Sequence, residues 1–282
     1  MKYALCNETF QGRGWAETCR AIAEAGYQGI EIAPFTLAEN VRDISAQARR
    51  EYAAVAKREG LDVVGLHWLL VSPKGLSVTD EDASVRDRTA RYLNELVNFC
   101  ADLGGRVLVL GSPSQRRLPT DVSPQSATQV AIDRLQACIE PALRAAHELG
   151  ITLCLEPLPA PEADFVLTLE EAVGIMARLL HPALQTIFDV KSASSEARSL
   201  PELISAYAPY IAHVHANDAN RRGPGFGATD YIPILSALTT AGYTGYVSVE
   251  VFDYTPDPVT IARESFAYMK RCEPEQEAPN GI

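Results

Sequence analysis

Residues 151–156 read I-T-L-C-L-E, a short apolar segment that ends on a carboxylate, and three later segments likewise end on a carboxylate or an imidazole. Short apolar runs of this kind favour buried strands. The later segments are L-Q-T-I-F-D at 184–189, I-A-H-V-H at 211–215 and Y-V-S-V-E at 246–250. A stretch with helical spacing of apolar residues follows each one, near Thr168–Leu180, Pro201–Ala208, Tyr231–Ala241 and Pro258–Arg271. The second half of the chain therefore predicts four strand-then-helix units.

The first half of the chain continues this alternation. Strands are predicted at Tyr3–Asn7, around G-I-E-I (29–32), up to His67, and at R-V-L-V-L-G (106–111), with helices near 44–60, 90–103 and 126–149. The charged segment Lys74–Arg88 is predicted to be a loop over the carboxyl ends of the strands. Eight units favour a single α/β domain, a (β/α)8 TIM barrel over residues 1–272, with residues 273–282 as a disordered tail. An open nucleotide-binding sheet would need G-x-G-x-x-G after the first strand, where this chain has N-E-T-F-Q-G-R-G-W.

The composition excludes several classes of partner. The chain has 282 residues, 36 of them acidic and 25 basic, for a formal net charge of −11. Such a surface repels nucleic acid and anionic lipid, so neither partner is expected. The six cysteines lack C-x-x-C spacing and are predicted to be reduced core residues. No apolar run is long enough for a signal region or a membrane span, so we expect a cytoplasmic protein.

Potential metal ligands end the last four predicted strands: Glu156, Asp189, His215 and Glu250. In a parallel barrel all strand carboxyl ends face the same rim, so these side chains can converge. A lone carboxylate at a strand end is more often a helix cap, but three in one mouth would repel one another unless a cation lay among them. An oxygen-rich set with one imidazole suits Mn²⁺ or Mg²⁺, with Co²⁺ and Zn²⁺ as further options. We therefore predict one divalent metal ion, with Mn²⁺ as the first choice.

Five pieces of the chain resemble a known family, the xylose-isomerase-like TIM barrels of the sugar phosphate isomerases/epimerases, and in particular its ketose 3-epimerases. They are W-A-E-T-C-R-A-I-A-E-A-G-Y-Q-G-I-E-I (15–32), E-P-L-P-A-P-E-A-D-F (156–165), I-F-D-V (187–190), H-V-H-A-N-D-A-N-R-R-G-P-G-F-G-A-T-D (213–230) and G-Y-T-G-Y-V-S-V-E (242–250). The resemblance covers nearly the whole chain. It implies the same barrel and the same four metal ligands.

The resemblance also implies chemical roles. Glu156 and Glu250 match the two glutamates that exchange protons with substrate carbon from opposite faces. A divalent ion holding a ketone oxygen and its neighbouring hydroxyl would stabilise the cis-enediolate left by deprotonation. Arg221 and Glu162 match residues that contact substrate oxygens, although on chemistry alone Arg222 competes with Arg221.

One position departs from the family pattern. The epimerases have a histidine three residues after the metal-binding aspartate, whereas this chain has D-V-K-S, with Ser192 at that place and Lys191 beside it. This loses an imidazole contact to the sugar and puts ordinary ketohexose epimerisation in doubt. Lys191 could bind an acidic group, but a surface lysine is the commoner case.

Further rim residues are candidates for substrate contact. His67 and Trp68 end the third strand, where the imidazole can face the mouth and the indole can stack on a sugar. His213 shares the face of His215 but lies deeper, so we assign it to the core or to support of the metal site. Glu8 and Glu31 end the first two strands, and either could touch substrate. Three residues after the fourth strand could contact an anionic group, unless they belong to a solvated loop: Ser112, Arg116 and Arg117.

The leading hypothesis is a metal-dependent isomerase or epimerase of a small keto-sugar or polyol-derived ketone, with a carbohydrate as its small-molecule partner. A lyase or dehydratase acting on an inosose or a 3-keto-glycoside is the near alternative. An AP-endonuclease-like barrel is less favoured, because it calls for a histidine-rich trinuclear zinc site and a basic face. A non-catalytic sugar-binding barrel is also kept, and a homo-oligomer is left open.

Overall fold

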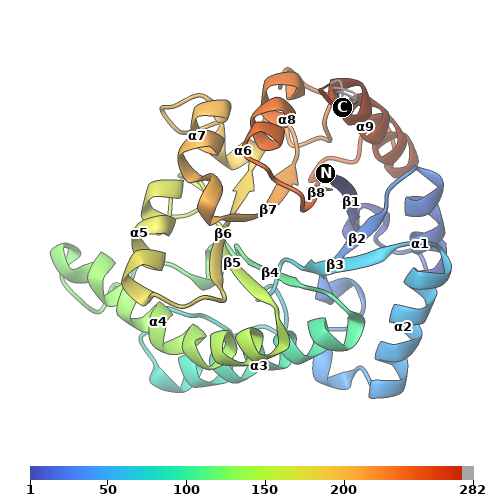
Figure 1. The fold of residues 1–282 in the computed structure, drawn as a ribbon. Coiled ribbons are helices and arrows are strands. Elements are labelled where there is room, and N and C mark those ends of the chain that lie inside the picture. Colours follow the sequence, from blue (N-terminus) through green and yellow to red (C-terminus); the bar gives the residue numbers. More distant parts are fainter. Residues whose placement is uncertain (275–282) are drawn as a thin grey trace, which may run out of the picture.

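The computed structural model describes residues 1–274 and shows a closed barrel of eight parallel strands in the order β1-β2-β3-β4-β5-β6-β7-β8 (Figure 1). The ring closes through β1 and β8, where Tyr3 pairs with Val247 and Leu5 with Val249. The predicted TIM barrel is therefore confirmed. The strands are β1 Lys2–Cys6, β2 Gly29–Ile32, β3 Asp62–Leu66, β4 Val107–Leu110, β5 Thr152–Leu155, β6 Leu184–Asp189, β7 Ile211–Ala216 and β8 Tyr246–Val249.

The helices form an outer layer around this ring (Figure 1). Their apolar faces pack on the outside of the strands, which is how a barrel buries both sides of its sheet. The helices are α1 Trp15–Glu24, α2 Ala46–Arg58, α3 Ala83–Leu103, α4 Pro124–Leu149, α5 Leu169–Leu179, α6 Val190–Ala193, α7 Leu200–Tyr207, α8 Tyr231–Thr240 and α9 Pro258–Cys272. The predicted tail falls mostly on residues 275–282, which lie outside the described residues.

Helix α3 begins earlier than predicted. The segment Lys74–Arg88 was expected to be a loop, but residues from Ala83 onward are helical. Asp82 caps the helix, because its side chain accepts a hydrogen bond from the Ser84 N–H at 2.7 Å. The guanidinium of Arg86 donates to the Asp80 carbonyl at 2.6 Å. The prediction of a loop is therefore wrong from Ala83 onward, because the charged side chains of this segment cap a helix and bind the backbone before it.

Polar side chains lie inside the barrel near the carboxyl ends of the strands, whereas barrel interiors are usually filled by aliphatic side chains. Buried groups on or just after the strands include Glu8, Glu31, His67, His213 and His215, all at most 4% exposed. Burying so many ionisable groups is costly unless they pair with one another or with an ion. This end of the barrel is therefore built for something other than stability.

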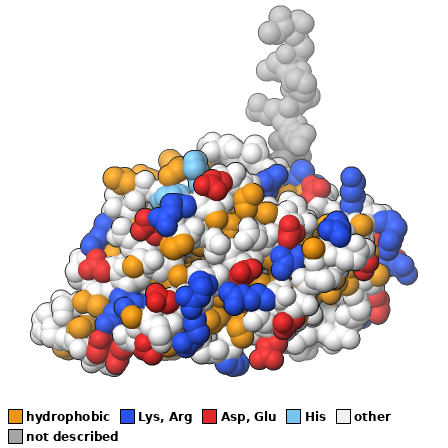
Figure 2. Space-filling view, turned by 90° about the horizontal axis from the view of Figure 1, so that it is seen from below, with side chains coloured by type: hydrophobic (Ala, Val, Ile, Leu, Met, Phe, Trp, Pro, Cys, Tyr) orange, Lys and Arg blue, Asp and Glu red, His pale blue; other side chains and the backbone are white. Residues whose placement is uncertain are grey.

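The distribution of charged side chains and the state of the cysteines can be compared with the expectations from the composition. Acidic and basic side chains are interspersed over the face seen in Figure 2, without a continuous basic band on that face. All six cysteines fall within the described residues and are buried free thiols. Within residues 1–274, no helix combines the length and the apolar character needed to cross a bilayer.

Candidate metal centre and active site

The structure brings the four predicted metal ligands together at the carboxyl ends of β5 to β8. One ligand atom each from Glu156, Asp189, His215 and Glu250 lies within 4.8 Å of the other three, and all four residues are buried. Two of them end or lie within strands, whereas Glu156 and Glu250 directly follow β5 and β8. We call these four residues the quartet.

Neighbouring groups hold the carboxylates of the quartet. Asp189 accepts hydrogen bonds from the Ser192 N–H at 2.7 Å and from the side-chain amide of Asn217 at 2.7 Å. The indole N–H of Trp68 donates to Glu250 Oε1 at 2.9 Å. These bonds fix the orientation of the Asp189 and Glu250 carboxylates, which a metal or catalytic site requires.

Gly111, which follows β4, leaves space for the side chain of Glu156. A Cβ built at this position would overlap the Oε2 atom of Glu156. The absence of a side chain after β4 therefore lets the Glu156 carboxylate occupy its place in the quartet.

The carboxylates of the quartet differ in acidity. Burial, together with the nearby charges of Glu250 and Asp189, raises the pKa of Glu156 to about 8. Burial and Glu250 also raise the pKa of Asp189. Burial acts against ionisation of Glu250 too, but the adjacent His215 outweighs it and lowers the pKa of that carboxyl. The adjacent carboxylates thus oppose the ionisation of Glu156 and Asp189, and a bound cation would relieve this repulsion.

The donor set fits a divalent cation. Three buried carboxylates offer oxygen ligands, and His215 offers a buried Nδ1 that has no hydrogen-bond partner among the described residues. This nitrogen lies 3.3 Å from Glu250 Oε2 and thus faces the other ligands. Oxygen-rich sets with one imidazole suit hard or borderline divalent ions.

The raised pKa of Glu156 predicts that metal affinity depends on pH. An ion would have to displace the proton of this carboxyl and that of His215, whose pKa is also raised, so the apparent Kd for Mn²⁺ should fall at least about tenfold per pH unit up to about pH 8. Titration calorimetry of chelator-treated protein at several pH values measures this slope. A Kd that stays constant between about pH 6 and the Glu156 pKa of about 8 would contradict the assignment of Glu156 as a ligand.

The quartet opens into a cavity of about 260 Å³. Three residues of its wall, Trp68, Ser112 and Arg221, have positive φ values of 54°, 39° and 71°. Non-glycine residues in this conformation are strained, and such strain is concentrated at functional sites. The backbone therefore places these side chains at the cavity at an energetic cost.

The two residues proposed from the resemblance as substrate contacts both line this cavity. Arg221 lies with its guanidinium 5.4 Å from the centre of the Phe252 ring. Glu162 pairs with Lys191 at 2.8 Å, and the Lys191 side chain is only 10% exposed. Lys191 is thus part of the site wall rather than a free surface cation. Arg222, the competitor of Arg221, instead pairs with Asp253 at 3.1 Å.

Among the other seven predicted rim residues, four line the cavity and three, Glu8, Glu31 and Arg116, do not. His67, Trp68, Ser112 and Arg117 are in its wall. Arg116 is not, and the expectation that it contacts substrate from the rim is not supported by its position. It is 1% exposed, and its guanidinium has no hydrogen-bond partner among the described residues. The sequence alone does not show which of two adjacent arginines in a loop faces the cavity, because the conformation of the turn decides this.

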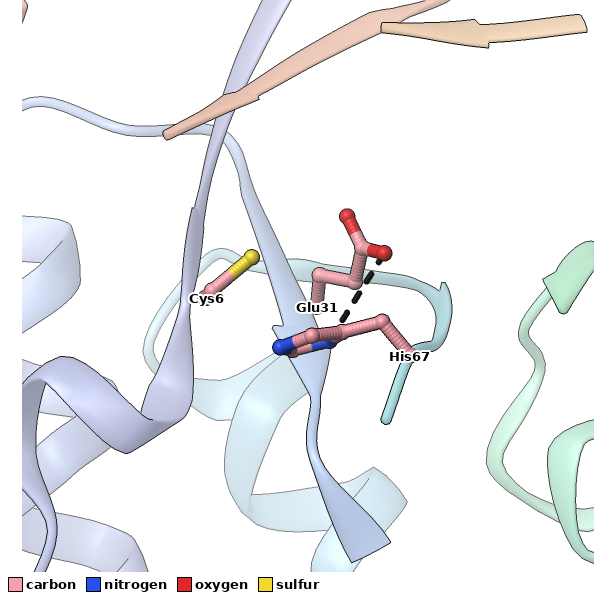
Figure 3. A group of neighbouring side chains, drawn as sticks. All are labelled: Cys6, Glu31 and His67. Carbon is pink, nitrogen blue, oxygen red and sulfur yellow. Dashed lines mark ion pairs between the residues drawn. The ribbon is translucent and has the colours of Figure 1, made fainter. Parts of the chain in front are cut away.

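A second group of ionisable side chains lies beneath the quartet, and from the sequence its members are only separate candidates, Glu8 and Glu31 for substrate contact and His213 for the core or for support of the metal site. Glu31 lies between histidines from β7 and the end of β3, and Glu8 contacts His67 at 3.0 Å. Figure 3 shows the Glu31 carboxylate facing the His67 ring, with Cys6 beside them. The sequence feature that could have pointed to Glu31 is its place on a predicted strand of the same barrel as the strand-end ligands. His213 belongs to this group rather than to the quartet.

Relatives of the chain are sugar epimerases. The 3-dehydro-D-guloside 4-epimerase of Escherichia coli (strain K12) is 25% identical over 280 residues, covering 96% of this chain and 100% of that protein. The D-psicose 3-epimerase of Ruminiclostridium cellulolyticum is 25% identical over 231 residues, covering 82% and 76%.

Solved structures agree on the fold. A D-psicose 3-epimerase crystallised in the presence of D-fructose superposes with a TM-score of 0.83 at 21% identity, covering 96% of this chain and 99% of that one. At this identity the likeness concerns the fold alone. The family model described as the xylose isomerase-like TIM barrel matches residues 19–272, which confirms the resemblance seen in the sequence. The chain belongs to the xylose isomerase-like TIM barrel family.

Proposed function

We propose that the protein is a divalent-metal-dependent isomerase or epimerase of a small keto-sugar or polyol-derived ketone. The observation that carries this proposal is the quartet, whose ligand atoms lie within 4.8 Å of one another and whose carboxylates line a cavity. Glu156, Asp189, His215 and Glu250 would hold the ion. When bound, the ion would supply Lewis-acid stabilisation for negative charge on two neighbouring substrate oxygens.

Glu156 and Glu250 are the proposed acid/base pair. Their environments push their pKa values apart, raised to about 8 for Glu156 and lowered for Glu250. Such a difference is typical of two carboxyl groups with different roles in proton transfer. In our proposal one glutamate removes the proton from a carbon next to the carbonyl, and the other returns a proton to that carbon or to its neighbour.

The names of the relatives support this choice of substrate class. D-psicose is a 2-ketose epimerised at carbon 3, and a 3-dehydro-glycoside epimerised at carbon 4 also reacts next to its carbonyl. Both reactions need the same proton transfer beside a ketone. We therefore propose a carbohydrate substrate in which the reacting carbon adjoins the carbonyl group.

Four residues of the cavity wall are the proposed substrate contacts: Arg221, Glu162, His67 and Trp68. Trp68 forms an aromatic wall with Phe252, at a centroid distance of 6.2 Å, and with Phe35 at 6.1 Å. Aromatic faces pack well against the C–H face of a sugar, whereas Arg221 and Glu162 can bind its hydroxyl groups. We propose Mn²⁺ as the ion and the cytoplasm as the location.

The proposal is tested by native metal analysis together with a panel of ketoses and 3-keto-glycosides, followed by NMR in deuterated water. We expect about one ion per chain and deuterium on the carbon next to the carbonyl, in a product that has lost neither water nor an aglycone. Loss of water or of an aglycone would instead identify a lyase. The absence of both metal and exchange would contradict the proposal.

A further inference from the structure

Glu31 is a fully buried carboxylate in β2 that contacts two histidines of β7. Its Oε2 lies 2.7 Å from His213 Nε2, and its Oε1 lies 3.0 Å from His215 Nε2. Both distances are those of hydrogen bonds between an imidazole N–H and a carboxylate oxygen. One carboxylate therefore binds the same nitrogen of two rings that project from the same face of one strand.

The ring of His215 bridges Glu31 and the quartet. Its Nε2 is bound to Glu31, whereas its Nδ1 lies 3.3 Å from Glu250 Oε2 and has no hydrogen-bond partner among the described residues. A neutral imidazole has one N–H donor and one nitrogen with a free lone pair. A proton held on Nε2 by Glu31 leaves the lone pair on Nδ1, directed at the other ligands.

We propose that Glu31 is a positioning residue that selects Nδ1 of His215 as the metal-binding atom, with His213 locking Glu31 in place. This inference rests on the proposed metal site. In this arrangement His213 occupies the second carboxylate oxygen, so Glu31 cannot rotate away from His215. Hydrogen bonds of this kind fix the tautomer and orientation of a metal-binding histidine and raise its basicity.

His67 contributes less to this arrangement. Its Nδ1 lies 3.7 Å from Glu31 Oε1, beyond hydrogen-bond distance, and its Nε2 is turned to Glu8 at 3.0 Å. Figure 3 marks this longer contact between the Glu31 carboxylate and the His67 ring with a dashed line. Glu8 is therefore a natural control, because it is also a buried glutamate bound to a histidine, but to one outside the quartet.

A second ion between Glu31, His213 and His215 is the competing interpretation, since these residues also lie close enough to share one. The distances of 2.7 and 3.0 Å argue against it, because each oxygen of Glu31 already meets one imidazole nitrogen at hydrogen-bond distance. Under our proposal, these nitrogens carry protons and bind no metal.

The first test measures metal affinity in Glu31→Gln and in the matched variant Glu8→Gln. A glutamine amide can accept a hydrogen bond from one histidine but must offer an N–H to the other, so it disrupts the pair of bonds at Glu31. We expect the Kd for Mn²⁺ to rise about 10- to 100-fold in Glu31→Gln and to change much less in Glu8→Gln, because the histidine bound by Glu8 is not a member of the quartet. An unchanged Kd in Glu31→Gln, or an equal loss in both variants, would overturn the proposal.

The second test uses the wild-type chain, so it holds even if Glu31→Gln fails to fold. Protein with ¹⁵N-labelled histidine is loaded with diamagnetic Zn²⁺, and long-range ¹H–¹⁵N spectra identify the protonated nitrogen of each ring. We expect Nε2–H and metal-bound Nδ1 for His215, Nε2–H for His213, and one Zn²⁺ per chain. Coordination through Nε2 of His215, or a second bound ion, would overturn the proposal.

These readouts separate this inference from the proposed function. If the wild-type chain binds no metal, the proposed metal site itself fails. If it binds one ion through Nδ1 but acts on no keto-sugar, the positioning role of Glu31 stands and the proposed activity fails.

Discussion

Replacing Glu250 by glutamine is expected to abolish deuterium exchange from solvent into substrate and to lower kcat by about 10²- to 10⁴-fold. The glutamine oxygen can still accept the Trp68 indole N–H, which reaches Glu250 Oε1 at 2.9 Å. The amide, however, cannot take a proton from carbon. Exchange is followed by NMR with whichever substrate the panel identifies.

The metal content of Glu250→Gln must be measured with the same sample, because Glu250 is also a proposed ligand. Glu264→Gln, a surface change at a side chain that is 52% exposed, is the control and should leave exchange intact. Exchange that persists in a metal-loaded Glu250→Gln enzyme would remove this glutamate from the proposed proton transfer.

Gly111→Ala is expected to reduce kcat about 100-fold, although it adds only one methyl group. The new Cβ would overlap Glu156 Oε2, so the carboxylate must leave its place in the quartet. Displacing a catalytic group by about 1 Å can cost a factor of about 10² in rate. We also expect weaker metal binding, because the displaced group is a proposed ligand. Steady-state kinetics and calorimetry measure the two effects.

Gly174→Ala is the matched control for Gly111→Ala. Gly174 lies in α5, and a Cβ there meets nothing within 4 Å. It should leave activity unchanged and stabilise the helix by roughly 0.5–1 kcal/mol. Wild-type kinetics in Gly111→Ala would show that the Glu156 carboxylate can shift without consequence and would argue against its role.

The sequence predicted the barrel and the quartet because both depend on local patterns. Short apolar segments such as I-T-L-C-L-E identify the strands, and parallel closure puts their carboxyl ends on one rim. Glu156 and Glu250 could thus be expected to meet, although 93 residues of chain, from 157 to 249, lie between them. Helix ends were less predictable, because Asp82 caps a helix within a segment whose charge suggested a loop.

The support of the site could not be predicted, because it depends on contacts across the barrel. Trp68 donates a hydrogen bond to Glu250 from a residue whose backbone has a strained, positive φ of 54°. The role of Glu31 depends on the stagger of β2 relative to β7, which no local pattern records. Similarly, only the turn after β4 decides that Arg117 faces the cavity while Arg116 is buried.

The contacts across the barrel also bear on how the chain folds. The quartet comes from β5–β8, but two of its members are held from the other half of the chain, His215 by Glu31 and Glu250 by Trp68. A carboxyl-terminal half formed alone would carry the ligands without these restraints. The proposed ion site would therefore reach its full affinity only in the closed ring, and a bound ion would stabilise the native state over partly folded states that lack β2 and β3. Cation uptake during refolding would report ring closure, a long-range step that local helix formation cannot replace.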